Sequence, residues 1–231
     1  MAERPVFIPS TNGNKLVDIK NIEFDWHKGM APSQKKKNII ELHSNANKKG
    51  IQNILEVSTK SENNLGVLLS AFNMKIISDS NKELSLESVF QGSKVFENGG
   101  PYIDLYNKNG YEVKKDDRIL NSGALIGFEY ENVKWDLEPK TAFYDWIYLN
   151  SLKTIIGIEE DLNVFDAFTD IEFNPKKSFN CQAKSCSLFV SLLRRNIFNE
   201  VMDDKEKFIH ILMNDQGMSE FNGQVNQQRL F

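Results

Sequence analysis

The sequence predicts a mainly α-helical protein with small β elements, folded as a single domain. A chain of 231 residues, of which 40% are hydrophobic and 26% charged, is long enough and apolar enough to bury a core. From residue 84 onward the apolar residues recur mainly at helical spacing, whereas the first 60 residues mix short extended segments with one helix. No internal repeat and no linker rich in glycine, serine or proline divides the chain. We therefore expect one domain over residues 1–213, with residues 1–60 as its N-terminal extension of strands and a helix.

The composition excludes several classes of protein. Two cysteines cannot hold a domain of this size together, so a disulfide scaffold is excluded. No apolar run approaches the ~18 residues that span a bilayer, and the N-terminus has no signal-peptide core, which predicts a cytoplasmic protein. The net charge of −4 gives no global electrostatic reason to bind nucleic acid. A nucleic-acid partner would therefore need a local basic patch.

The N-terminal elements are read from short patterns. Residues 5–9 form an apolar run between two prolines, and residues 18–24 alternate polar and apolar side chains as a half-buried strand does. Ser33 is suited to cap a helix that carries Ile39, Ile40 and Leu42 toward a core and stops near Gly50. Residues 54–57 predict another strand.

The later elements are mainly helices. Ser85 is suited to cap a helix that runs to about residue 96, and Pro101 stands where a short helix begins. Residues 126–135 alternate around a turn and predict a β-hairpin. Further helices are predicted over residues 141–151, 159–164, 181–195 and 203–213. Beyond Met213 the chain loses its periodicity, so residues 214–231 are predicted to form a mobile tail.

The segment from residue 85 to residue 96 carries the first candidate site. In a helix, its core-facing side would carry the apolar residues Leu86, Val89, Phe90 and Phe96. Glu87, Gln91 and Lys94 fall within about 60° of one another on a second face. Glu87 and Lys94 stand about 10 Å apart along the axis, too far for a local ion pair. The pattern favours a solvated face; the alternative is the polar wall of a pocket, with an acid and an amine that reach one substrate.

The second candidate is an acidic segment, Asp166-Ala167-Phe168-Thr169-Asp170-Ile171-Glu172-Phe173-Asn174-Pro175. In an extended conformation Asp170 and Glu172 would face one side, and Ile171 and Phe173 the other. Acids held among aromatic rings tend to have raised pKa values, as general acids and bases do. An edge strand with one wet face explains the pattern equally well.

The third candidate is a polar loop, Ser58-Thr59-Lys60-Ser61, followed by Leu69-Ser70-Ala71-Phe72-Asn73. A ring to stack on, with hydroxyl and amide groups beside it, is what a nucleobase or a nicotinamide-like ring needs. Metal sites are not indicated, because the three histidines are far apart and Cys181 and Cys186 have no second pair.

Taken together, these stretches resemble the NADAR (YbiA-like) family. The family pattern has a Leu-Ser-Asn-Phe-like element, here residues 69–73, and a helix with Glu followed by Phe-Gln-Ala-x-Lys-Phe, here Glu87 and residues 90–96. The resemblance is closest to the subgroup that is associated with DNA-ADP-ribosylating toxins of the DarT type. The shared motifs include Arg4-Pro5-Val6-Phe7, Ser33-Gln34-Lys35, Thr141-Ala142-Phe143-Tyr144-Asp145-Trp146 and Asn180-Cys181-Gln182-Ala183. The match runs from about residue 4 to residue 213.

The resemblance implies an N-glycosidase that removes ADP-ribose from guanine bases of DNA, as the antitoxin to a DNA ADP-ribosyltransferase. Cleavage of a C–N bond at an anomeric carbon builds positive charge on the ribose, which a carboxylate can stabilise. We expect Lys94 and Glu87 to be the catalytic centre, with Asp170 assisting, and Lys94 to act as a general acid or as a nucleophile. The expected substrate-binding residues are Lys60, Ser70, Phe72, Asn73, Gln91, Tyr144, Trp146 and Glu172. Neither a metal nor a cofactor is expected.

Two other functions remain open from the sequence. One is an antitoxin that neutralises the toxin or grips ADP-ribose without cleaving it. The other is a YbiA-like N-glycosidase that acts on a riboflavin-pathway metabolite. If DNA is the substrate, the basic patch that guides the strand would come from lysines 60, 176, 177 and 184, or from lysines 35 to 37.

Overall fold

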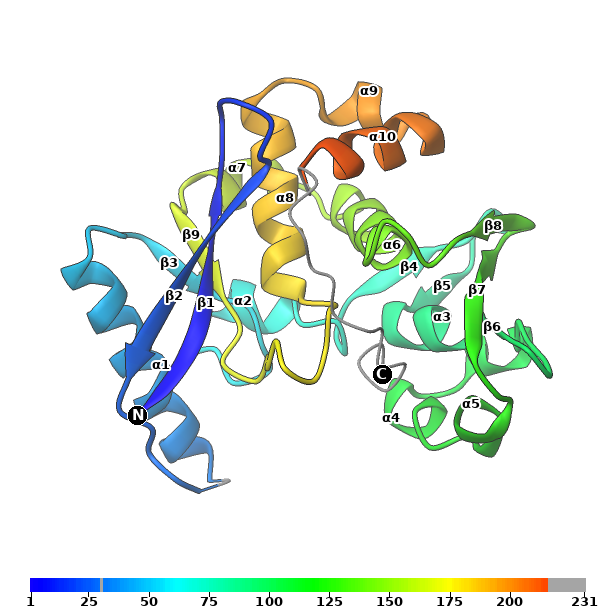
Figure 1. The fold of residues 1–231 in the computed structure, drawn as a ribbon, viewed down its shortest axis with the longest axis horizontal. Helices are drawn as coiled ribbons and strands as arrows, with labels where there is room; N and C mark the ends of the chain where they lie inside the picture. Colours follow the sequence, from blue (N-terminus) through cyan, green and yellow to red (C-terminus); the bar gives the residue numbers. More distant parts are fainter. Residues whose placement is uncertain (30, 216–231) are drawn as a thin grey trace.

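A four-stranded sheet forms one half of the protein in a computed structural model, which describes residues 1–29 and 31–215. Its strand order is β2-β1-β9-β3 (Figure 1). β1 (Ala2–Pro9) and β2 (Val17–Phe24) pair antiparallel along their whole length. β9 (Ala167–Thr169) is antiparallel to β1 and parallel to β3 (Ile54–Glu56). Because β9 lies between two strands, it is not the edge strand that the sequence left open.

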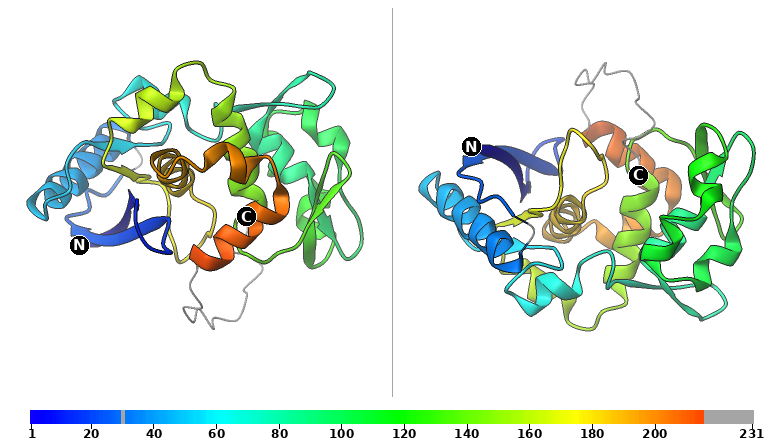
Figure 2. Two further views of the ribbon diagram at one scale, coloured as in Figure 1. Left: turned by 90° about the horizontal axis from the view of Figure 1, so that it is seen from above. Right: turned by 90° about the horizontal axis from the view of Figure 1, so that it is seen from below.

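Helices cover both faces of this sheet and create two cores. α1 (Pro32–Lys48) packs on one face and α8 (Gln182–Arg194) on the other (Figures 1 and 2). Alternation along β1 divides its side chains, because successive residues of a strand face opposite sides. Val6 enters the small core beneath α1, and Phe7 enters the large core on the α8 side. The sheet therefore separates an α1 face from an α8 face.

The other half of the protein is built around α3 (Leu86–Gly92) and a three-stranded sheet of β6 (Lys94–Phe96), β7 (Leu125–Tyr130) and β8 (Val133–Trp135). The hairpin predicted over residues 126–135 is confirmed. Glu131 and Asn132 form its two-residue turn, and both have positive φ, as the twist of a tight hairpin requires. Short elements surround this sheet: β4 (Lys75–Ile77), β5 (Glu83–Ser85), η1 (Ile103–Asn107), α4 (Gly110–Val113) and α5 (Asp117–Asn121).

The remaining helices join the two halves. α6 (Ala142–Lys153) crosses the middle of the protein and packs against α3 and α8. α2 (Asn64–Leu68), α7 (Ile158–Asn163), α9 (Phe198–Met202) and α10 (Lys205–Asp215) complete the described chain. No helix within residues 1–29 and 31–215 is long and apolar enough to cross a membrane.

Several predicted element boundaries were wrong. The helix expected to run from Ser85 to about residue 96 ends at Gly92, and the chain continues as strand β6. A Cβ at position 92 would lie 2.7 Å from the ring of Tyr106, so the close packing of η1 requires glycine there. The helix expected over residues 203–213 is α10, shifted by two residues, and the short helix α9 that precedes it was not predicted. α1 begins after Ala31 with Pro32 in its first turn, so Ser33 is not its cap.

The fold is a mixture of helices and sheets in which more residues are helical than extended. The β component is larger than the small elements expected, because strands distant in sequence assemble into the four-stranded sheet. The single-domain prediction for residues 1–213 stays a prediction. The predicted tail begins within α10, which ends at Asp215, and residues 216–231 lie outside the described residues.

Gln182, at the start of α8, ties three segments together. Its Nε2 donates to the Val57 carbonyl at 2.6 Å, and its Oε1 accepts the Ala71 N–H at 2.7 Å. One side chain thus holds the end of β3, the 69–73 segment and α8 in register. Because both backbone partners belong to buried residues, water cannot readily replace the lost contacts.

We predict that Gln182→Ala lowers the free energy of unfolding by about 2–4 kcal/mol, because two buried backbone groups lose their partners. Chemical denaturation measures this loss. The control is Gln52→Ala, at an exposed position, which should change stability by no more than about 0.5 kcal/mol. Equal effects of the two substitutions would show that the bridge contributes nothing.

Candidate active site

Lys94 lies at the first position of β6 and is fully buried. Its Nζ stands 5.3 Å from the ring centroid of Phe90, one turn back on α3. Burial lowers the pKa of Lys94 to about 7; the charge of Glu87 opposes this shift, and that of Lys114 adds to it. An amine with such a pKa can give or take a proton near neutral pH.

Glu87 and Gln91 project from α3 beside this amine, and they are also buried. The exposed fractions of Glu87, Gln91 and Lys94 are 5, 2 and 0%, so the preferred reading of a solvated face was wrong. Gln91 Nε2 donates to Glu87 Oε1 at 2.9 Å, and the same oxygen lies 3.2 Å from Lys114 Nζ. Gln91 Oε1 is buried and has no hydrogen-bond partner among residues 1–29 and 31–215. Such an acceptor is suited to a donor on a ligand.

The short helix α4 brings two further side chains to this region. Gly110 allows the approach, because a Cβ there would lie 2.9 Å from Glu87 Cβ. Tyr111 stacks on Phe72, with ring centroids 4.3 Å apart and planes 6° apart. Lys114, just after the helix, lies 4.8 Å from the Phe72 ring centroid as well as against Glu87. The half-buried ring of Phe72, the exposed ring of Tyr111 and a cation therefore adjoin the buried acid.

Asp170 comes from the other half of the protein, directly after β9. The expectation of an extended segment was wrong here: the chain turns, so Asp170 is buried while Glu172 is exposed. Asp170 Oδ1 accepts the N–H groups of Glu172 at 2.9 Å and Phe173 at 3.2 Å, which fixes the turn. Burial raises the pKa of Asp170 to about 7, against the opposing effect of these hydrogen bonds.

Tyr144 on α6 lies between the two halves. Its ring packs edge-on against Phe90, with centroids 5.2 Å apart. Burial raises the pKa of Tyr144 well above its usual value, and the charges of Glu87 and Asp170 both add to this shift. The hydroxyl therefore lies within electrostatic reach of both carboxyl groups. Glu87 and Asp170, which are far apart in the sequence, are thus both near Tyr144 in the fold.

The other predicted binding residues are distributed more widely. Ser70 is buried and Lys60 half-buried in the segments that follow β3 and α2. Asn73 is exposed, and its Nδ2 donates to the Val67 carbonyl at 2.8 Å. Glu172 pairs with Lys35 on α1 at 2.9 Å. Trp146 lies two residues beyond Tyr144 and packs between Trp135 and Phe208, on another side of α6.

Sequence reasoning missed Lys114, Tyr111 and the buried acid Glu56. Lys114 belongs to a charged run, Glu112 to Asp117, that gives no periodic signal. Glu56 lies inside the predicted strand 54–57, between the apolar residues Leu55 and Val57, and a carboxyl group in an apolar run could have marked it.

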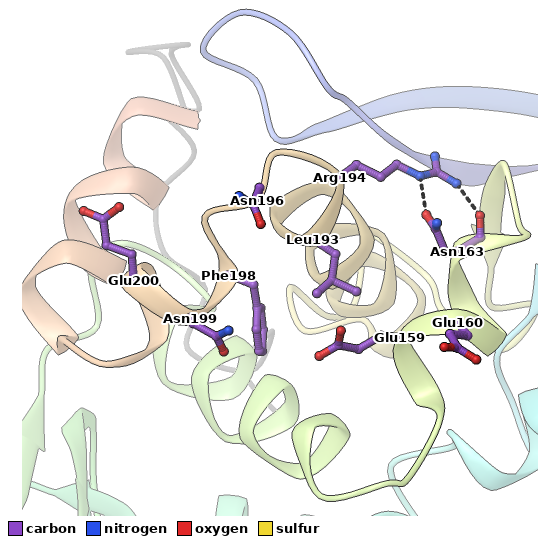
Figure 3. Close-up of a pocket in the computed structure, with 9 residues that line it drawn as sticks. All are labelled: Glu159, Glu160, Asn163, Leu193, Arg194, Asn196, Phe198, Asn199 and Glu200. Carbon is purple, nitrogen blue, oxygen red and sulfur yellow. Dashed lines mark hydrogen bonds between the residues drawn. The ribbon is translucent and has the colours of Figure 1, made fainter.

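Two hollows lie elsewhere on the surface. One, of about 350 Å³, lies between α7, α8 and α9, and Figure 3 shows its acidic lining and the hydrogen bonds from Arg194 to Asn163. None of the predicted site residues lines it. The other, of about 710 Å³, lies between α1 and β3 and is lined by His43 and Glu56 among others. Within the described part of the chain, no three His, Cys, Asp or Glu side chains form a group that could hold a metal ion.

Comparison with known proteins identifies the family. No curated protein matches the chain significantly. The family described as DarT1-associated NADAR antitoxin matches residues 2–221, which include every residue of the site described above. This match spans both halves of the fold and confirms the resemblance drawn from the motifs. The chain therefore belongs to the DarT1-associated NADAR antitoxin family.

Proposed function

We propose that this protein is an N-glycosidase that removes ADP-ribose from guanine bases of DNA, and so reverses the modification made by its toxin. The observation that carries the proposal is the buried Lys94, whose pKa of about 7 makes it a proton-transfer group beside Glu87 and the unpaired acceptor of Gln91. Membership of an antitoxin family supports the biological role.

The reaction breaks the bond between ribose C1″ and the amino nitrogen of guanine. Positive charge develops on the ribose as this bond lengthens, and the carboxylate of Glu87 would stabilise it. Lys94 would donate a proton to the leaving nitrogen, which departs as the amino group of guanine. Asp170 would take a proton from the attacking water, whose oxygen ends on C1″. The products are free ADP-ribose and unmodified guanine, and Lys94 and Asp170 exchange protons with solvent before the next turnover.

Lys94 can instead act as a nucleophile. Its neutral amine would attack C1″ as the bond to guanine breaks, and a proton of the new ammonium group would pass to the departing nitrogen. Cleavage of the C1″–O4″ bond, with a proton from solvent on O4″, would leave the opened ribose as a protonated Schiff base, which water hydrolyses to free ADP-ribose and the amine. The pKa of about 7 permits either role, because both forms of the amine are populated near neutral pH.

The surroundings of the reaction centre suit an ADP-ribosylated nucleotide. The Phe72–Tyr111 pair offers an aromatic face to a base, and Lys114 places a cation where a diphosphate could lie. A single flipped or unpaired guanine needs only a local site, which is compatible with the net charge of −4. Lys35 and Lys36 of the predicted basic patch are engaged with Glu172 and Glu62, so we favour Lys60 and the lysines after residue 175 as the route of the strand.

We predict that Lys94→Ala lowers the turnover of a guanine-ADP-ribosylated oligonucleotide by about 10²–10⁴-fold, because the proton donor or nucleophile is lost. Release of ADP-ribose, followed by chromatography, measures it. Lys115→Ala, at an exposed neighbour of Lys114, is the control and should retain wild-type turnover. Wild-type turnover in Lys94→Ala would refute the assigned role. Protection from the toxin only at stoichiometric amounts would favour the non-catalytic antitoxin.

The pH dependence distinguishes the two roles of Lys94. Asp170 must be ionised, so activity should rise with pH through about 7. If Lys94 is the acid, activity should fall again as the amine loses its proton, also near pH 7, and the profile is a bell. We expect this bell. A profile that rises to a plateau, with a covalent adduct trapped by borohydride, would instead identify Lys94 as the nucleophile.

Lys114→Ala should move the alkaline limb of the bell to higher pH by roughly 0.5–1 pH unit. Lys114 lowers the pKa of Lys94, and its removal also leaves the charge of Glu87 without its ion pair, so both changes raise the pKa of Lys94. The measurement is kcat from pH 5.5 to 9.5, with Lys115→Ala as the matched control. If the alkaline limb does not move, Lys114 has no effect on the pKa of Lys94.

A further inference from the structure

A second buried polar cluster lies on the α1 face of the four-stranded sheet. Glu56 on β3 and Thr169 on β9 are directly paired across parallel strands, so their side chains stand next to each other on one face. His43 reaches them from α1, with its Nε2 2.7 Å from Thr169 Oγ1. His43 is thus linked through Thr169 to the carboxyl group of Glu56, and both His43 and Glu56 line the cleft beside α1.

Glu56 binds the residues on both sides of Asp170, one through its backbone and one through its side chain. Its Oε1 accepts the N–H of Ile171 at 2.8 Å, immediately after Asp170. Its Oε2 accepts the hydroxyl of Thr169 at 2.7 Å, immediately before Asp170. Ser58 adds a third donor to Oε1 at 2.7 Å. A carboxyl group that is fully buried and receives three hydrogen bonds is fixed in position, so the turn that carries Asp170 is fixed with it.

The charges around this cluster come from every element that packs on it. Asp170 follows β9, and Arg4 on β1 lies within electrostatic reach of Asp170 and Glu172. Cys181, which caps the start of α8, is a neutral thiol, because burial and the charges of Asp170 and Glu56 raise its pKa. Lys35 on α1 pairs with Glu172, while Lys48 and Glu62 line the cleft at its outer end. Burial raises the pKa of Glu56 to about 8, and the charge of Asp170 adds to the shift. Burial lowers the pKa of His43 to about 4, so its ring is neutral near pH 7. The hydroxyl of Thr169 therefore has an uncharged hydrogen-bond partner in His43.

We propose that Glu56 is a positioning residue for Asp170, which it holds through Ile171 and Thr169. Because these two residues flank Asp170 in the chain, the two carboxyl groups are also held near each other, so the charge of one acts on the other. This inference rests on the proposed function, because it assigns Glu56 a part in the reaction of the same site. Glu56 faces α1 and has no role as a group that touches substrate. Its effect passes through the geometry and the charge of Asp170.

The kinetic test compares three variants on the ADP-ribosylated oligonucleotide. Glu56→Ala removes the acceptor, and it should lower kcat by about 10²-fold with little change in KM, because the carboxyl of Asp170 is displaced while the binding groups remain. Its acidic limb should move to lower pH, since Asp170 is released toward water. Glu56→Gln can still accept from Ile171 and donate to Thr169, so it should recover at least tenfold of the lost kcat. Glu62→Gln, in the same cleft but exposed, is the control and should match the wild type.

The coupling is tested without any activity. In protein labelled with ¹³C at glutamate Cδ, the signal that Glu56→Gln removes should titrate near pH 8 in the wild type. In Asp170→Asn the same signal should titrate at lower pH, because the neighbouring negative charge is gone. This measurement uses folded protein and decides the coupling even where Glu56→Ala does not fold.

The outcomes are distinguishable from failure of the proposed function. No release of ADP-ribose by the wild-type protein would refute the function, and the glutamate titration would still decide the coupling. With an active wild type, an unmoved acidic limb and unchanged kcat in folded Glu56→Ala would overturn the positioning role. Loss of activity in Glu56→Gln as complete as in Glu56→Ala would also overturn it, since the charge itself would then be required. An identical Glu56 titration in Asp170→Asn would overturn the coupling.

Discussion

Burial of the Lys94 amine is the constraint on which the rest of the site depends. An ammonium group far from water is costly unless a partner compensates it or it gives up its proton. Here the cost appears as a lowered pKa, partly offset by Glu87, and Glu87 is itself held by Gln91 and Lys114. The cost of burying the charge thus makes Lys94 a group that can transfer protons at neutral pH.

The same principle operates in the other half of the protein. Asp170 and Glu56 are buried carboxyl groups with raised pKa values, and the backbone around Asp170 is fixed by donors that Glu56 collects. α6 and α8 carry the groups that join the two halves, Tyr144 and Gln182. The reaction centre that we propose therefore draws on both halves of the protein, and a reaction of this kind needs an acid and a base that are placed around one bond.

The net charge of −4 is compatible with the local site that we propose. Recognition by chemistry at one base needs a concave set of aromatic and hydrogen-bonding groups, and it does not need a basic surface along a duplex. We propose the Phe72–Tyr111 stack as the aromatic part of such a set, with Lys114 4.8 Å from the Phe72 ring centroid. On α1, Lys35 and Lys36 are paired with the acids Glu172 and Glu62.

The sequence by itself determined the family and the approximate positions of most helices and strands, and it singled out Glu87, Lys94 and Asp170 as the catalytic residues that we propose. These follow from local patterns: periodicity, turn residues and motifs of adjacent residues. The break between Gly92 and Lys94 was not predictable, because it depends on Tyr106 packing where a Cβ would otherwise stand. Burial of Glu87 was likewise decided by α4, which comes twenty residues later and packs on it through Gly110. Only the tertiary structure could assign Glu56 to Asp170, because the pairing of parallel strands β3 and β9 joins residues more than a hundred positions apart, and desolvation depends on what covers a group in space.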